Sequence, residues 1–256
     1  MEDTRSIIFF FIFLVFFDIM KKKQEKNEMR ERIYRRLTEL AEPGEYAEFS
    51  RRICATRYPI LGVRLPVLRE IAKKICRGDW RAFLSEPGRG SYEEIMLEGM
   101  VTAGAKAELE EKLERTRAYF PKIDCWALTD SVVPTYRFKK TELPRVREFI
   151  TPLLQSPEEF EARFALIVLL DYFLTPEYAA WTAETVASLQ SDKYYVNMAR
   201  AWILAELAVQ HGELTFALLE SGRLDPFTHN KTISKMCDSR RISDGAKQRA
   251  RSLRRK

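Results

Sequence analysis

The segment DCWALTDSVVPTYRF places an aromatic ring and an acid four residues apart. In a helix, Trp126 and Asp130 share one face, while Val132 and Val133 turn toward a core. A carboxylate held beside an aromatic ring in partly dehydrated surroundings can stabilise a developing positive charge and hydrogen-bond to water. The alternative is structural, with Asp130 capping a turn before Ser131 and Trp126 in the core.

Two further segments carry side chains that an apolar helix does not need. Arg163 interrupts the apolar stretch EARFALIVLLDYF, so its charge must be paired or must face a groove. A salt bridge to Glu159 or Asp130 is the structural alternative. The segment YYVNMARAWILAELA places three large side chains on one helix face: Tyr194, Met198 and Trp202. Core packing is the default interpretation of such a stripe.

Helices are expected to hold these side chains, because from Glu28 onward apolar residues recur three and four apart and no alternating strand pattern persists. Five prolines fall in or just before the first turn of an expected helix, where a missing N–H costs least: Pro66, Pro144, Pro157, Pro176 and Pro226. The expected helices are 28–41, 45–55, 65–77, 79–85, 91–103, 106–119, 124–138, 142–154, 157–174, 177–190, 192–210, 213–220, 226–238 and 243–254. The predicted fold class is therefore all-α.

A repeat of 36 residues indicates how these helices are arranged. At that offset the apolar positions of 161–173 match those of 197–209, as Ala165 with Ala201, Leu166 with Trp202, Ile167 with Ile203 and Val168 with Leu204. Each repeat is an outer helix (142–154, 177–190) followed by an inner helix (157–174, 192–210), the period of HEAT-like stacks of antiparallel helix pairs. We expect a solenoid with a concave groove lined by the inner helices, and function in that groove.

Composition excludes several protein classes. With 256 residues, 46% hydrophobic and 31% charged, and only 10 Gly and 11 Pro, the chain is not collagen-like, disordered or of low complexity. Four scattered cysteines form no C-x-x-C pair and suit a reducing cytoplasm, and two histidines without nearby cysteines predict no structural zinc. Nucleotide-binding, serine hydrolase and zincin motifs do not occur.

The positive charge lies at the ends of the chain. The net charge is +6, but basic residues are concentrated in 20–36 and 239–256, and the part between them is mildly acidic. A DNA-binding body must then present a local basic surface. Solvated ends are the alternative explanation of the charge.

The run IIFFFIFLVFF at residues 7–17 is shorter than the about 20 residues that span a bilayer, and it lacks the flanks of a secretory signal. We expect residues 1–27 to be an extension, disordered or not native, upstream of a start at Met20 or Met29, with a weak membrane contact as the second choice and no stable insertion. Residues 28–256 are expected to form one HEAT-like domain with a basic C-terminal helix.

The motif W-x-x-x-D-S-x-V-P at 126–134, with Arg163 in the next inner helix and Trp202 in the one after, resembles the AlkD-type DNA alkylation repair proteins. These proteins are alkylpurine DNA glycosylases built from HEAT-like repeats. The resemblance runs over about 28–240 and includes YPILGVRLPVLREIAKKI and RLDPFTHNKTISKMCDSRRIS. One position departs from the family, since Cys125 stands where its well-studied members carry a second aromatic residue.

The resemblance implies roles for individual residues. Asp130 would be the catalytic carboxylate, Trp126 and Trp202 the aromatics on the lesion nucleotide, and Arg163 the groove arginine that holds a phosphate. Further DNA contacts are expected from Tyr194, Arg200, Lys231 and Lys235. A wider set of basic candidates adds Arg64, Arg69, Arg137, Lys139 and Lys193.

The implied activity is hydrolysis of the N-glycosidic bond of cationic N3- or N7-alkylated purines in duplex DNA, without deep base flipping. The implied partner is double-stranded DNA with alkylated bases, and no cofactor or metal, a monomer and a cytoplasmic, nucleoid-associated location are expected. Two alternatives stay open: a non-catalytic HEAT-like protein that binds damaged or branched DNA, and a helical scaffold that binds a polypeptide.

Overall fold

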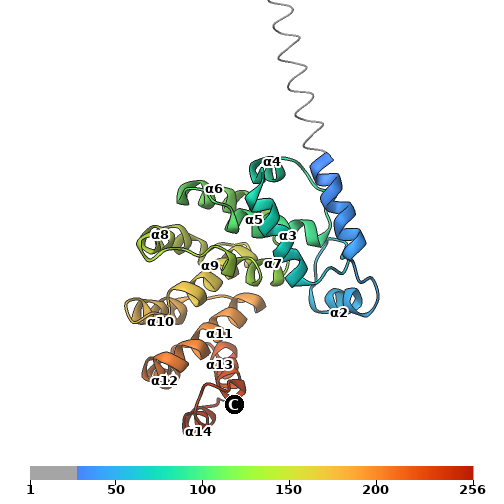
Figure 1. Ribbon diagram of the computed structural model, residues 1–256. Coiled ribbons are helices and arrows are strands. Elements are labelled where there is room, and N and C mark those ends of the chain that lie inside the picture. Colours follow the sequence, from blue (N-terminus) through green and yellow to red (C-terminus); the bar gives the residue numbers. More distant parts are fainter. Residues whose placement is uncertain (1–27, 256) are drawn as a thin grey trace, which may run out of the picture. The chain divides into compact units, whose positions relative to one another are not determined.

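The computed structural model describes residues 28–255 and is helical throughout that range, with no strand (Figure 1). The predicted all-α helical-repeat class is confirmed. The expectations for the N-terminal extension lie outside the described residues. The described chain groups into two compact units, one up to Ala107 and one from Glu108 onward. The prediction of a single domain over 28–256 stays a prediction.

The first unit contains a helical segment at 28–40 and four further helices. They are α2 (Glu45–Ile53), α3 (Leu65–Arg77), α4 (Trp80–Ser85) and α5 (Tyr92–Gly104). Local chemistry sets their starts: Asp79 accepts from the Ala82 N–H at the start of α4, and Ser91 and Glu94 form a capping box at the start of α5. Helix α5 packs against α3 and α4, and its residues 92–103 are buried.

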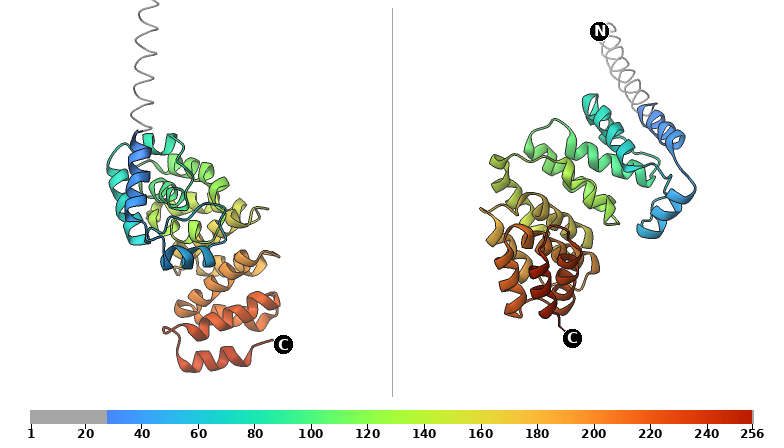
Figure 2. Two further views of the ribbon diagram at one scale, coloured as in Figure 1. Left: turned by 90° about the vertical axis from the view of Figure 1, so that its right-hand side faces the viewer. Right: turned by 60° about the horizontal axis from the view of Figure 1, so that its bottom comes forward.

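The second unit carries the repeats predicted from the sequence. Its helices are α6 (Leu109–Tyr119), η1 (Phe120–Lys122), α7 (Ala127–Asp130), η2 (Val133–Thr135), η3 (Lys140–Glu142), α8 (Leu143–Leu153), α9 (Glu159–Tyr172), α10 (Ala179–Ser188), α11 (Tyr194–Gln210), α12 (Gly212–Ser221), α13 (Pro226–Asp238) and α14 (Asp244–Ser252). Helices α8, α10, α12 and α14 form an outer layer, and α9, α11 and α13 an inner layer (Figures 1 and 2). Helix α11 packs against both α9 and α13.

The repeat alignment is confirmed by burial. Ala165, Ala201, Val168 and Leu204 are all fully buried, as expected of inner helices that are enclosed by their neighbours. Trp202 is the exception, because it keeps part of its surface exposed where its repeat partner, Leu166, is fully buried. The repeat alignment therefore identifies both the buried core positions and Trp202 as the position that departs from them.

The expected helix over 124–138 was wrong. The chain forms the single-turn helix α7 and then the short 3-10 helix η2, which begins at Val133 and has Pro134 in its first turn. Proline removes a backbone donor and disfavours the helical conformation of the residue before it, so one continuous helix cannot pass this point. The turn that matters survives, since the Asp130 N–H donates to the Trp126 carbonyl at 3.0 Å.

Candidate functional site

An ion pair between Asp130 and Arg163 lies at the centre of the candidate site. The guanidinium donates to both carboxylate oxygens, from Nε to Oδ1 at 3.0 Å and from Nη2 to Oδ2 at 2.7 Å. Its Nη1 donates to the Tyr195 carbonyl at 2.7 Å, and the Thr129 hydroxyl donates to Asp130 Oδ1 at 2.7 Å. Two parallel hydrogen bonds fix both position and orientation, so the carboxylate is held rigidly.

The pair is more buried on the arginine side than on the acid side. The side chain of Arg163 is 6% exposed and that of Asp130 is 13% exposed. Trp126, one helical turn before Asp130, is also partly exposed. Of the two interpretations of Arg163, the salt bridge to Asp130 is the one that the structure shows. The Asp130 carboxylate is therefore partly accessible to solvent, while the Arg163 guanidinium makes its hydrogen bonds to groups within the protein.

Lys235 on α13 connects this pair with Trp202. Its Nζ lies 5.7 Å from the centre of the Trp202 ring. Burial lowers the pKa of Lys235, the positive charges of Lys231 and Arg163 lower it further, and Asp238 and Asp130 oppose them. These mutual influences place two lysines, an arginine and two aspartates in one electrostatic neighbourhood. Trp202, Lys231 and Lys235 are partly exposed within it.

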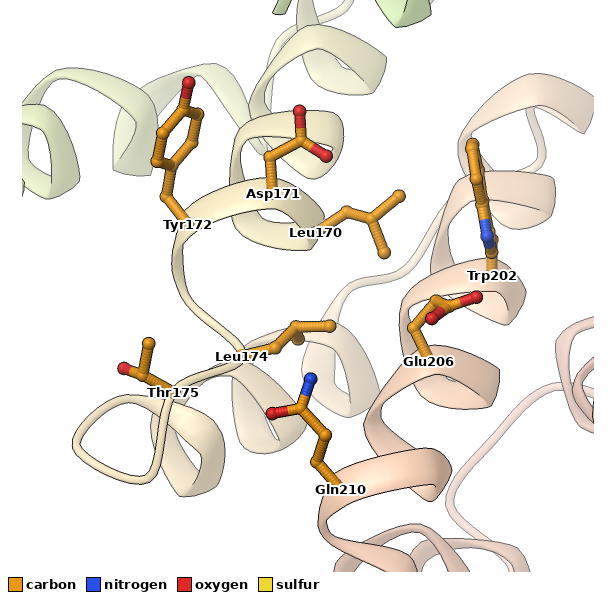
Figure 3. Close-up of a pocket in the computed structure, with 8 residues that line it drawn as sticks. All are labelled: Leu170, Asp171, Tyr172, Leu174, Thr175, Trp202, Glu206 and Gln210. Atoms are coloured by element: carbon orange, nitrogen blue, oxygen red, sulfur yellow. The ribbon is translucent and has the colours of Figure 1, made fainter. Parts of the chain in front are cut away.

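A pocket of about 380 Å³ opens beside Trp202 (Figure 3). Its lining consists of Leu170, Asp171, Tyr172, Leu174, Thr175, Trp202, Glu206 and Gln210. In Figure 3, Leu170 and Asp171 on α9 lie across the pocket from Trp202 and Glu206 on α11. Glu206 is paired with Arg241. The lining thus combines two leucines, one indole ring and two carboxylates.

Asp171 is a residue that the sequence analysis missed. Its side chain reaches solvent, but the surrounding protein partly desolvates the carboxyl group, and this, followed by the negative charge of Asp130, raises its pKa to about 6. The sequence did contain a cue, because Asp171 ends the apolar run FALIVLL two helical turns after Arg163. Eight residues at about 100° each place this acid about 80° round the helix from the arginine, at the edge of the same broad face.

Tyr194 belongs to a row of aromatic rings rather than to the core. It is 54% exposed and lies 5.2 Å from Tyr195 and 5.7 Å from Phe227, measured between ring centres. Tyr195 in turn lies 5.5 Å from Phe160. The default interpretation of the stripe on α11 as core therefore does not hold at its first position.

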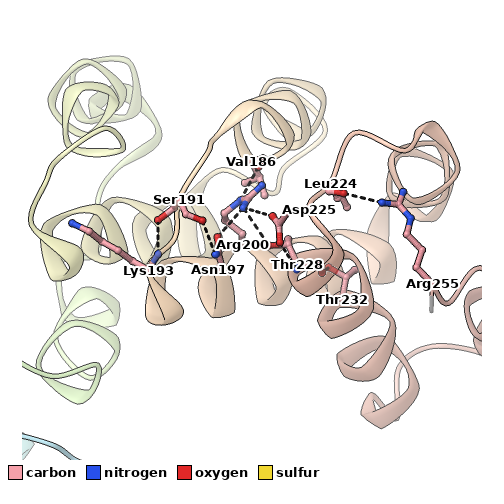
Figure 4. A network of polar contacts seen from close by, with 10 residues as sticks. All are labelled: Val186, Ser191, Lys193, Asn197, Arg200, Leu224, Asp225, Thr228, Thr232 and Arg255. Carbon is pink, nitrogen blue, oxygen red and sulfur yellow. Dashed lines mark hydrogen bonds and ion pairs between the residues drawn. The ribbon is translucent and has the colours of Figure 1, made fainter.

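Arg200 has a structural position. It is 1% exposed and its guanidinium donates to the Val186 carbonyl, Asn197, Asp225 and Thr228 at 2.7 to 3.2 Å (Figure 4). Burial lowers the pKa of this guanidinium, and the charge of Asp225 opposes that effect. The expected DNA contact at Arg200 is corrected accordingly, because a side chain enclosed in this way offers no surface to a phosphate.

The other basic candidates lie at or near the surface. Arg64, Arg69, Arg137 and Lys139 are exposed and Lys193 is partly exposed, with its amine bound to the Pro157 carbonyl. Arg64 pairs with Glu42 in the first unit. In the part of the chain that the structure describes, no cluster of three or more His, Cys, Asp or Glu side chains could hold a metal ion, and no helix has the length and apolarity to cross a membrane.

The chain was compared with known proteins. The family model described as DNA alkylation repair enzyme matches residues 33–237, most of the chain. That range contains Trp126, Asp130, Arg163, Asp171, Trp202 and Lys235. No curated protein matches.

Proposed function

The chain belongs to the family of DNA alkylation repair enzymes, and we propose that it is a monofunctional DNA glycosylase for cationic N3- or N7-alkylated purines in duplex DNA. Alkylation at N3 or N7 gives the purine a positive charge, which makes the base a good leaving group. Little acid catalysis is then needed. The protein has to stabilise the oxocarbenium-like sugar and to orient the attacking water.

The observation that carries this proposal is the rigid, partly exposed carboxylate of Asp130. Its negative charge is held in place by the two hydrogen bonds from Arg163 and is still accessible from solvent. A preorganised charge of this kind costs no reorganisation when a cation develops beside it. We assign to Asp130 the stabilisation of the sugar cation and the positioning of water.

Arg163 acts in this proposal as a positioning residue. Its three hydrogen bonds, to the two oxygens of Asp130 and to the Tyr195 carbonyl, leave it nearly enclosed. Holding the carboxylate is a better use of that geometry than holding a phosphate. The phosphate contacts are assigned to Lys231 and Lys235, whose partly exposed side chains lie in the same electrostatic neighbourhood.

Trp126 and Trp202 are assigned to the deoxyribose and backbone of the lesion nucleotide. Both rings are partly exposed. Attraction between an indole face and a cationic sugar contributes about 0.5 to 2 kcal/mol, by analogy with cation–π contacts. We propose that the lesion base is not flipped deeply into a pocket. We also propose that the protein acts as a monomer without metal or cofactor, in the cytoplasm, on the DNA of the nucleoid.

The test is release of 7-methylguanine or 3-methyladenine from methylated duplex DNA. Asp130→Asn keeps the shape of the side chain and removes its charge, so we expect release to fall by about 100-fold or more. Asp192→Asn is the matched control, because Asp192 is an exposed acid just before α11, and it should release base at the wild-type rate. Full activity in Asp130→Asn would remove the proposed mechanism.

One observation favours a second candidate, a non-catalytic protein that binds damaged or branched DNA. Arg163 occupies both carboxylate oxygens of Asp130 and offsets part of its charge. If the Asp130–Arg163 pair does not open toward a substrate, the protein would bind DNA without releasing a base. This candidate requires salt-sensitive DNA affinity with no base release by the wild-type protein.

A further inference from the structure

Four aromatic rings form a continuous row at the N-terminal turns of three successive inner helices. Phe160 is on α9, Tyr195 and Tyr194 are on α11, and Phe227 is on α13. The distances between successive ring centres are 5.5, 5.2 and 5.7 Å. We call these four residues the aromatic row. It joins residues that are up to 67 positions apart in the sequence, so the repeat, not local chain order, assembles it.

Half of the aromatic row faces solvent. Over residues 28–255 the large hydrophobic side chains that are exposed are Phe49, Ile53, Tyr194 and Phe227, and the last two are in contact with each other. Tyr194 is 54% exposed and Phe227 is 39% exposed. Burying these rings would gain hydrophobic free energy that the chain forgoes. Two exposed rings in contact therefore mark a surface that a partner can cover.

A lysine lies at the Phe227 end of the row. Lys231 Nζ lies 5.9 Å from the centre of the Phe227 ring. A hollow of about 420 Å³ beside that ring is lined by Pro226, Phe227, Asn230, Lys231 and Ser234, none of which is acidic. Arg254 donates to the Ser234 hydroxyl at 3.0 Å. This lining complements a partner that has flat rings and negative charge.

The other end of the row touches the proposed reaction site. The Tyr195 carbonyl accepts the hydrogen bond from Arg163, and the Arg163 Cζ lies 5.8 Å from the centre of the Tyr195 ring. The row thus runs from the Asp130–Arg163 pair across the N-terminal turns of α9, α11 and α13 to the hollow beside Phe227. A strand bound at the pair can continue along it.

We infer that the aromatic row binds unpaired nucleotides of DNA, with bases stacked on Tyr194 and Phe227 and a phosphate at Lys231. Aromatic rings beside cationic side chains are the general means by which proteins hold unpaired strands, because every base has a face that stacks and every nucleotide carries a phosphate. The inference rests on the proposed function only for the choice of DNA as the partner.

The experiment measures fluorescence anisotropy of a labelled oligothymidylate and of a labelled, lesion-free duplex with the full chain. Stacking of one base on an aromatic ring contributes strongly to affinity. Tyr194→Ala and Phe227→Ala should therefore each weaken oligothymidylate binding about 5- to 100-fold. The ratio of oligothymidylate affinity to duplex affinity should fall in both. Tyr194→Phe and Phe227→Tyr, which keep the rings, should keep that ratio.

Phe49→Ala is the matched control. Phe49 is 47% exposed and lies 5.9 Å from an Arg52 guanidinium, but its hollow is lined by Glu45 and Glu48 as well. An acidic lining repels phosphate, so this variant should bind both probes as the wild type does. The inference is overturned if the wild type does not bind oligothymidylate, if the alanine variants at 194 and 227 bind it normally, or if they lose both probes equally.

Base release is measured on the same proteins to separate this inference from the proposed function. Asp130→Asn should lose release and keep oligothymidylate affinity. If the wild type releases no base, the glycosylase proposal fails, and the anisotropy ratios still decide the inference.

Discussion

Arg163 and Arg200 lie on successive inner helices, and each is paired with an aspartate from a neighbouring element. Asp225 caps α13 with one oxygen, which accepts the Thr228 N–H at 2.8 Å, and binds Arg200 with the other at 2.7 Å. Asp130 caps no helix, and its contacts are Arg163 and the Thr129 hydroxyl. The same Asp–Arg pairing thus occurs in two settings: Asp225 also completes a helix cap, whereas Asp130 caps no helix and is the carboxylate to which the proposed function assigns the chemistry.

Arg200→Met is expected to give the largest effect, on stability. Removing one partner of a buried pair leaves the other groups unpaired, at a cost of about 3 kcal/mol, the low end for such changes because Asp225 is 31% exposed. The measurement is the denaturant midpoint of the full chain. An unchanged midpoint would mean that the Arg200–Asp225 pair does not stabilise the fold.

Asp130→Asn and Asp225→Asn are expected to differ in activity. The first should lower base release about 100-fold or more, and the second should leave the rate of the folded protein unchanged because an asparagine still caps a helix. The measurement is single-turnover release of methylated purine. Equal losses in both variants would erase the distinction between the two pairs.

Arg163→Lys sharpens the assignment of the arginine. Lysine keeps the charge but cannot donate two parallel hydrogen bonds, so the carboxylate of Asp130 is less well oriented and release should fall about tenfold. The apparent affinity for the substrate should change little if Arg163 positions Asp130. A loss that appears mainly in DNA affinity would instead support a phosphate contact at Arg163.

Asp171→Asn tests the smallest effect, a dependence on pH. The folded-state pKa of Asp171 is raised to about 6, so its carboxyl group is neutral below that pH and negative above it. Its charge should then assist a nearby cation, and release should rise about two- to threefold as the pH increases through 6, the effect of one charge at roughly 8 Å in water. The variant should lack this step. A step of equal size in the variant would assign it to another group.

Linkage also predicts a pH dependence for the stability of the Arg200–Asp225 pair. Burial by itself raises the pKa of Asp225, but hydrogen bonds from Thr228 and then the charge and hydrogen bond of Arg200 bring it below its ordinary value. The stability that this acid contributes is therefore present above its unfolded-state pKa of about 4 and is lost as the pH falls through the folded-state pKa. In Asp225→Asn, the midpoint of thermal unfolding should therefore fall less than in the wild type as the pH is lowered through that range.

Much of the fold could be predicted because helix boundaries depend on local chemistry. The expected helices 65–77 and 226–238 match α3 and α13 residue for residue, and a proline in the first turn marks each. In place of the expected helix 124–138 the chain forms a single turn, α7, that ends at Asp130, followed by η2 with Pro134 in its first turn. The roles of Asp130, Arg163 and Trp202 stay predictions, whereas Arg200 was expected to contact DNA and is buried, and neither the raised pKa of Asp171 nor the exposed ring of Phe227 was expected from the sequence.

The amino-acid sequence by itself determined the helical repeats and which residues share a helix face, because both follow from spacing within one element. Only the tertiary structure decided which acid each arginine meets and which rings touch. The Asp130–Arg163 and Arg200–Asp225 bonds join residues 33 and 25 positions apart, and the Tyr194–Phe227 contact also crosses between helices. Such contacts depend on how one helix lies against the next, and a face assigned by periodicity does not specify its neighbour.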